Sequence, residues 1–166
     1  METKEKNLEQ DIESWLLSEG GYVKGNMWTY DKKRAIDMPV LIQFIESTQP
    51  NQWERYKNIY GEQAKNQLYK IFQSNVAQSG LIYVLRNGIK DRGIGLKFVY
   101  FEPASGLNEE LVEKYQANIL TETRQFFYST ENKNSIDMVL SVNGIPVVAL
   151  ELKNQFTGQT VENSKH

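Results

Sequence analysis

Apolar residues recur every three or four positions through the first half of the chain, the spacing of a helix with one buried face. The first stripe predicts a helix that ends at Gly20-Gly21, with buried positions at Leu8, Ile12, Trp15 and Leu16. The same spacing predicts helices at residues 40–45, 53–60 and 68–76, with Pro50 between the first two and Gly80 ending the third. The amino-terminal half is therefore predicted to be helical.

The pattern changes after Gly80, where short apolar segments are bounded by turn residues. It predicts a hairpin of strands 81–86 and 95–101, a helix 108–119 capped by Asn108, and strands 123–128, 135–142 and 146–152. Strands and helices in this order favour an α/β fold, a mixed β-sheet flanked by helices with a helical amino-terminal half. No internal repeat or obvious linker interrupts the sequence, so residues 1–166 are predicted to form a single domain.

Composition restricts the class of protein. With 40% hydrophobic and 24% charged residues, the 166-residue chain has the composition of a globular domain. Its apolar runs are too short to span a bilayer, and no apolar segment follows its charged first residues, so we expect neither a membrane span nor a secretory signal. The lack of cysteine excludes disulfides and thiolate metal sites and favours a cytoplasmic location. A net charge of −2 gives no overall indication of nucleic-acid binding.

Two local features could nevertheless contact DNA. Residues 86–97 contain four basic side chains and one acid, and such patches neutralise phosphates; the basic residues are Arg86, Lys90, Arg92 and Lys97. Trp28 lies in sequence near Lys24 and a basic triplet at residues 32–34, although we expect its indole to be packed rather than to contact DNA. Trp15, on the first helical stripe, is predicted to lie in the core.

The residues that indicate chemistry are Asp137, Glu151 and Lys153, on the last two predicted strands. Asn143-Gly144 between these strands is a strong hairpin signal, and alternation along the second strand puts Glu151 and Lys153 on one face. Two neighbouring carboxylates can bind Mg²⁺ together with waters and a substrate phosphate, and a lysine beside them can act on the attacking water. These are the parts that phosphodiester hydrolysis needs; the alternative is that they are ordinary charges at strand ends.

The hairpin loop decides whether Asp137 and Glu151 can share a metal ion. A loop of only Asn143-Gly144 places Asp137 opposite Leu150 and puts the two carboxylates on opposite faces of the sheet. A three-residue loop, residues 143–145, or a bulge places Asp137 opposite Glu151, with Cβ atoms roughly 5 Å apart. The nuclease hypothesis therefore requires a three-residue loop or a bulge in this hairpin.

A longer string of residues resembles a known family. It comprises Asp137, an apolar strand, Asn143-Gly144-Ile145-Pro146, a second apolar strand, Glu151-Leu152-Lys153-Asn154 and Thr157-Gly158-Gln159-Thr160-Val161. This string resembles the amino-terminal nuclease domain of type I restriction enzyme R (HsdR) subunits, which belong to the PD-(D/E)xK nuclease superfamily. The likeness covers most of the chain and implies a restriction-endonuclease-like core. By this resemblance Asp137 and Glu151 would bind Mg²⁺ with the Leu152 backbone carbonyl, and Lys153 would position or activate the attacking water.

Many members of the superfamily add an acidic residue from the first helix, and Glu9 is the candidate here, with Glu13 one turn on as the alternative. Glu9 could equally be a solvent-facing helix charge. In the family a Gln-xxx-Tyr helix and an ATP-driven DNA translocase follow, whereas this sequence ends at His166 and has no phosphate-binding loop. We therefore expect a truncated nuclease domain, with ATP used only in absent motor domains.

The implied function is Mg²⁺-dependent cleavage of double-stranded DNA by a type I site-specific deoxyribonuclease. Its expected partners, through the full-length protein, are the methyltransferase and specificity subunits of a type I restriction complex. Two alternatives remain open, a PD-(D/E)xK repair nuclease and a non-catalytic nuclease-like module for DNA binding or subunit docking. The sequence downstream would distinguish a restriction subunit from a repair nuclease. A lack of metal affinity at Asp137 and Glu151 would indicate the non-catalytic module.

Overall fold

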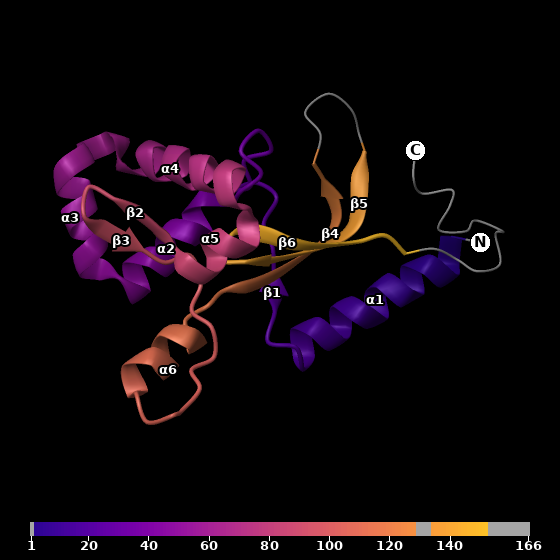
Figure 1. The fold of residues 1–166 in the computed structure, drawn as a ribbon. Helices are drawn as coiled ribbons and strands as arrows, with labels where there is room; N and C mark the ends of the chain where they lie inside the picture. The colour runs from indigo at the N-terminus through magenta and orange to yellow at the C-terminus, as the bar shows by residue number, and fades with distance from the viewer. Residues whose placement is uncertain (1, 129–133, 153–166) are drawn as a thin grey trace. The chain divides into compact units, whose positions relative to one another are not determined.

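The computed structural model describes residues 2–128 and 134–152, and Figure 1 shows their helices and strands. The chain divides into two compact units. The first unit comprises Met1–Ile36, Leu120–Ser141 and Ile145–His166, and the second unit comprises Asp37–Ile119 and Val142–Gly144. Each unit therefore combines segments that lie far apart in the sequence.

The first unit contains a helix and a four-stranded mixed sheet. Its elements are α1 (Glu2–Ser18), β1 (Val23–Lys24), β4 (Leu120–Phe127), β5 (Ser135–Val142) and β6 (Ile145–Leu150). The sheet order is β1-β4-β5-β6, and β1 runs parallel to β4 with Lys24 opposite Glu122. Only two residues join β5 to β6, which is possible only for antiparallel strands. The mixed sheet and the α/β class predicted from the sequence are confirmed.

The second unit is mainly helical. Its elements are α2 (Met38–Thr48), α3 (Pro50–Tyr60), the 3-10 turn η1 (Gly61–Gln63), α4 (Ala64–Ser79), α5 (Leu81–Asn87), β2 (Ile89–Asp91), β3 (Ile94–Leu96) and α6 (Glu109–Gln116). Phe44, Tyr56, Leu68 and Phe98 are fully buried in it. Phe72 of α4 packs edge-on against Phe98, with ring centroids 4.9 Å apart. An apolar, largely aromatic core therefore stabilises this unit.

The helix ends follow local signals in the sequence. Asp37 caps α2, since its Oδ1 accepts a hydrogen bond from the Val40 N–H at 3.3 Å. Pro50 begins α3, and Asn108 caps α6 by accepting from the Leu111 N–H at 3.2 Å. The predicted helices and the Asn108 cap are confirmed. No helix described within residues 2–128 and 134–152 is long and apolar enough to cross a membrane.

One predicted strand is wrong. Residues 81–86 form the helix α5, in which the Val84 and Gly88 amides donate to carbonyls four residues back, at 3.2 and 2.7 Å. A short apolar run has no clear period, so a helix that buries only Val84 resembles a strand in the sequence. The hairpin is correspondingly displaced from 81–86 and 95–101 to β2 and β3, and it turns at Arg92-Gly93.

Two tryptophans also differ from the prediction. Trp15 on α1 is 60% exposed and Trp28 after β1 is 97% exposed, so neither lies in the core. Among residues 7–18 of α1 the buried positions are Glu9 and Leu16, which lie seven residues apart and therefore on one face. α1 thus buries a carboxylate, which needs a partner inside the first unit.

Candidate active site

The turn between β5 and β6 is formed by Asn143 and Gly144 alone. Both have left-handed backbone φ angles, 51° and 81°, as a two-residue type I′ turn requires. The predicted three-residue loop is therefore wrong, and the two-residue loop places Asp137 opposite Leu150. In a regular strand the Asp137 and Glu151 side chains would then lie on opposite faces, so the loop does not meet the condition that the nuclease hypothesis set for it. A Cβ on Gly144 would lie 2.3 Å from the Asp37 carbonyl oxygen, and the Gly144 carbonyl accepts from the Asp37 N–H at 2.8 Å. This close approach, together with the positive φ, explains why the turn forms on a glycine.

Asp137 nevertheless contacts the segment that carries Glu151. Its Oδ2 accepts a hydrogen bond from the Leu152 backbone N–H at 2.7 Å. β6 ends at Leu150, so Glu151 and Leu152 lie beyond the regular strand. Strict alternation of faces therefore no longer fixes the direction of the Glu151 side chain. The contact between Asp137 and Leu152 brings the first predicted carboxylate to the backbone beside the second.

This end of the hairpin has the donor chemistry that Mg²⁺ accepts. Asp137 is half-buried and Glu151 is exposed, and both supply carboxylate oxygens next to the Leu152 carbonyl. Mg²⁺ keeps several waters, so one or two carboxylates suffice for it. Within residues 2–128 and 134–152, no three acidic, histidine or cysteine side chains form a metal site on their own. Lys153 and the family-like string at residues 157–161 lie outside the described residues.

Glu9, the candidate for an additional metal ligand, is buried and paired with Arg124 of β4. Arg124 donates from Nε and Nη2 to Glu9 Oε2 at 3.1 and 2.9 Å, and from Nη1 to Glu13 Oε2 at 2.9 Å. Gln125 Nε2 adds a contact of 3.3 Å to Glu9 Oε1, and the φ of 48° at Gln125 is left-handed, an irregularity within β4. Glu9 is therefore not a solvent-facing charge, and its role as a metal ligand stays a prediction.

Glu13 and Glu122 complete this group of charges. Lys24 Nζ lies 3.0 Å from Glu13 Oε1. Burial raises the pKa of Glu13, but the hydrogen bonds and charges of Lys24 and Arg124 together lower it below its usual value. Glu122 is 1% exposed, and burial and the nearby Glu13 carboxylate raise its pKa to about 7. We call Glu9, Glu13, Lys24, Glu122 and Arg124 the charged cluster.

The sequence interpretation did not find Glu122 or Arg124. They are two residues apart, which puts them on one face of a strand, but the predicted strand began at Thr123 and left Glu122 outside. The sequence contains two signals of this group. One is the pair of charges on one strand face, and the other is the pair of acids, Glu9 and Glu13, four residues apart. Neither signal shows that α1 and β4 meet across 115 residues of sequence.

The four basic residues predicted to contact phosphates lie on or beside the β2–β3 hairpin of the second unit. Arg86 is in the last turn of α5. Lys97 follows β3, and its Nζ donates to the Arg86 backbone carbonyl at 3.0 Å. Arg92 lies in the turn, over the Tyr60 ring at 5.5 Å from its centroid, and Lys90 is exposed on β2. The hairpin therefore gathers these charges, and their contact with DNA stays a prediction.

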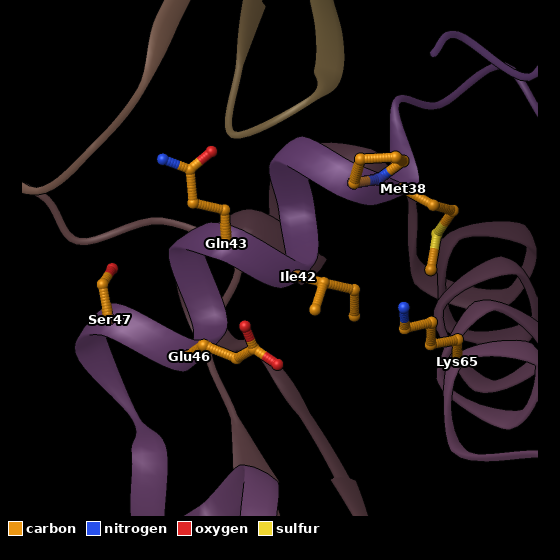
Figure 2. A pocket seen from close by; sticks show the side chains of 7 residues that line it. Met38, Ile42, Gln43, Glu46, Ser47 and Lys65 are labelled. Atoms are coloured by element: carbon orange, nitrogen blue, oxygen red, sulfur yellow. The ribbon is translucent and has the colours of Figure 1, made fainter. Parts of the chain in front are cut away.

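A pocket of about 760 Å³ in the second unit offers less chemistry. Figure 2 shows it between α2 and the Lys65 side chain of α4, with Ile42 and Met38 along one side. Glu46 is its one carboxylate, and Glu46 Oε1 accepts from the Trp53 indole N–H at 3.2 Å, a structural contact. Neither Asp137 nor Glu151 lines this pocket.

The mixed sheet, with carboxylates at the open end of its hairpin, is a nuclease-like α/β core. The sequence model of the family described as type I restriction enzyme R protein N terminus matches residues 3–165. Because this match covers nearly the whole chain, the chain belongs to that family. No curated protein and no solved structure matches the chain.

Proposed function

We propose that this chain is a Mg²⁺-dependent endodeoxyribonuclease domain of a type I restriction R subunit, which hydrolyses phosphodiester bonds of double-stranded DNA. The observation that supports this is the hydrogen bond from Leu152 N–H to Asp137 Oδ2, 2.7 Å long. It joins the acid of β5 to the backbone beside Glu151. Because Glu151 lies beyond the end of β6 at Leu150, its side chain would turn to the face of Asp137 to complete a shared site. Membership of the family supplies the restriction context.

Asp137 and Glu151, with the Leu152 carbonyl, would hold the metal ion. When bound, Mg²⁺ supplies Lewis-acid chemistry, since it acidifies a water and offsets negative charge on the phosphate. The Leu152 N–H orients the Asp137 carboxylate. Lys153 would donate a hydrogen bond to the attacking water or to a phosphate oxygen.

The partners follow from the same proposal. A type I R subunit works with methyltransferase and specificity subunits, so the DNA sequence would be recognised by another chain. Phosphate contacts from Arg86, Lys90, Arg92 and Lys97 would position DNA without reading bases. ATP would be used by motor domains of a full-length R subunit and not by this nuclease domain.

The test is substitution within an assembled restriction complex that carries this domain. Asp137→Asn should abolish DNA cleavage and leave ATP-driven translocation intact, because translocation does not use the hairpin. The matched control is Asp11→Asn, an exposed acid on α1. Cleavage retained by Asp137→Asn would overturn the proposal.

Metal binding by the chain alone gives a second readout. We expect calorimetry to detect Mn²⁺ binding to the unsubstituted chain and to Asp11→Asn, and none to Asp137→Asn. Glu9 is paired with Arg124, and among residues 2–128 and 134–152 no group of three acids forms a metal site, which favours a non-catalytic DNA-binding or docking module as the second candidate. A folded chain with no Mn²⁺ affinity and no cleavage would favour that module over the nuclease.

A further inference from the structure

A pocket of about 370 Å³ lies in the first unit, beside the charged cluster and apart from Asp137 and Glu151. It is lined from α1 by Glu13, from β4 by Glu122, and from β1 and the following loop by Lys24, Asn26 and Trp28. This volume falls in the range of small-molecule sites, in which a few polar groups fix the orientation of a ligand. Neither Asp137 nor Glu151 lines it, so the proposed metal site at the hairpin does not account for it.

Glu122 gives this pocket an unmet hydrogen-bond acceptor. The residue is 99% buried, since 1% of it is exposed, and its Oε2 has no hydrogen-bond partner among residues 2–128 and 134–152. A buried acceptor without a donor destabilises the fold. A ligand that donates an N–H to Glu122 would remove that cost, so the acceptor indicates a ligand with a donor group.

Trp28 lies at the rim of the same pocket with its indole in solvent. Its backbone N–H donates to Asn26 Oδ1 at 2.9 Å. The Thr29 N–H and Oγ1 donate to the Asn26 carbonyl at 3.3 and 3.0 Å. These bonds hold the backbone of the turn, and the indole is 97% exposed. An exposed aromatic ring offers a face on which a planar ligand can stack.

The charges in the loop that follows β1 indicate the class of ligand. The pocket itself is lined by two bases, Lys24 and Arg124, and two acids, Glu13 and Glu122. From Tyr22 to Ile36 the sequence has four basic residues and one acid: Lys24, Lys32, Lys33, Arg34 and Asp31. Lys24, Lys32 and Lys33 are exposed, and such a basic loop attracts a polyanion, although an arginine side chain could also donate to Glu122. Basic side chains beside an exposed aromatic ring are the combination that binds single-stranded nucleic acid.

We propose that this pocket binds one unpaired base of DNA, stacked on Trp28, with the base's exocyclic amino group donating to Glu122 Oε2. Lys24 would contact the adjoining phosphate. The choice of DNA as ligand rests on the proposed function, and the site itself is separate from the hairpin. Cytosine, adenine and guanine have such an amino group and thymine does not. The pocket should therefore distinguish cytosine from thymine.

The test measures binding of fluorescein-labelled single strands of about ten deoxycytidines or ten thymidines, by anisotropy, in EDTA. We expect the deoxycytidine strand to bind more tightly, and Trp28→Ala to weaken its binding about tenfold, as loss of base stacking does. Trp15→Ala is the matched control, since Trp15 is an exposed tryptophan of the same unit. The affinity of this variant for the deoxycytidine strand should stay within about twofold of that of the unsubstituted chain. Glu122→Leu, which replaces the unmet acceptor with an apolar group, should remove the preference for deoxycytidine and leave thymidine binding unchanged.

Equal effects of Trp28→Ala and Trp15→Ala would overturn the proposal. So would a deoxycytidine preference that persists in Glu122→Leu. An oligoarginine peptide that binds through Glu122, with no strand binding, would assign the pocket to a cationic partner instead. EDTA removes the metal, so these results do not depend on cleavage. If the base pocket fails, the Mn²⁺ and cleavage tests at Asp137 still stand, and if those fail the base binding can still be measured.

Discussion

The two units accommodate buried polar groups in different ways. In the second unit they are mostly neutral and mutually satisfied: Gln49 donates to the Lys97 carbonyl at 2.9 Å and accepts from the Lys97 N–H at 2.7 Å. The hydroxyls of Tyr56 and Tyr60 both donate to Asp91 Oδ2, at 2.9 and 2.7 Å. In the first unit the charged cluster takes their place, and it contains the unmet oxygen of Glu122.

The polar network of the second unit serves the fold alone, whereas the charged cluster of the first unit also has a polar atom that could bind a ligand. A satisfied amide such as Gln49 fixes two segments and offers nothing further to a ligand. The charged cluster needs Arg124 to compensate Glu9 and Glu13, and burying these charges costs free energy that good geometry recovers only in part. Residual cost of this kind, at Glu122, is expected where a site serves binding rather than stability.

The largest expected effect is at the centre of the charged cluster. Arg124→Met removes the bonds to Glu9 Oε2 and to Glu13 Oε2, and leaves Lys24, which pairs with Glu13, as the cation beside two largely buried carboxylates. We expect the free energy of unfolding to fall by about 3–5 kcal/mol, measured by urea denaturation. The control is Lys57→Met, which breaks an exposed pair with Glu54 and should change the free energy of unfolding by less than about 1 kcal/mol. Equal effects of the two substitutions would contradict the compensating role of Arg124.

The corresponding substitution in the second unit is Asn143→Ala. The Asn143 side chain accepts from the Ile119 N–H at 2.7 Å and donates to the Phe98 carbonyl at 2.8 Å and to Asn118 Oδ1 at 2.9 Å. Its loss leaves buried backbone groups unpaired and puts alanine at a φ of 51°. We expect a loss of about 2–4 kcal/mol in urea denaturation. Asn143→Gly tolerates the φ, so a loss of similar size in that variant would assign the effect to the hydrogen bonds, whereas a small loss would assign it to backbone strain.

Local patterns predicted much of the fold. The helical stripes, the Asn108 cap and the Asn143-Gly144 hairpin each depend on residues a few positions apart, and each is present in the structure. The helix at Leu81–Asn87 was missed because its apolar run has no period that separates a buried helix from a strand. The Trp15 prediction failed because α1 buries Glu9, and that depends on Arg124 more than a hundred residues away.

The candidate site was predictable only in part, for the same reason. Asp137 and Glu151 could be found from spacing and resemblance, because both lie near one hairpin. The loop length was wrong, since turn geometry alone does not show that Asp137 reaches past the strand to the Leu152 N–H. Glu122 could not be found, because burial and an unmet oxygen arise only when α1, β1 and β4 pack together.

The smallest expected effect is a stabilisation, at Glu122, and it depends on pH. The folded-state pKa of Glu122 is about 7 and the ordinary value is 4.5. Between these two pH values the folded chain keeps the proton that the unfolded chain has lost, so stability falls as pH rises. Above about pH 7 Glu122 is ionised in both the folded and the unfolded chain, so the loss of stability no longer changes with pH. Below about pH 4.5 Glu122 is protonated in both states, and no stability is lost. Glu13, with its pKa lowered, acts below this window and with the opposite sign.

Glu122→Gln removes this titration and keeps the shape of the side chain. At pH 8 we expect the variant to be more stable than the unsubstituted chain by about 1–3 kcal/mol, and at pH 4 to be equal to it. Urea denaturation at several pH values measures the difference, and Glu62→Gln, an exposed acid of η1, is the control that should give no such pH dependence. The Asn143 and Arg124 substitutions are expected to destabilise the chain. If Glu122→Gln instead stabilises it, the Glu122 carboxylate is kept at a cost to folding. A pH-independent difference would instead mean that its charge plays no part in that cost.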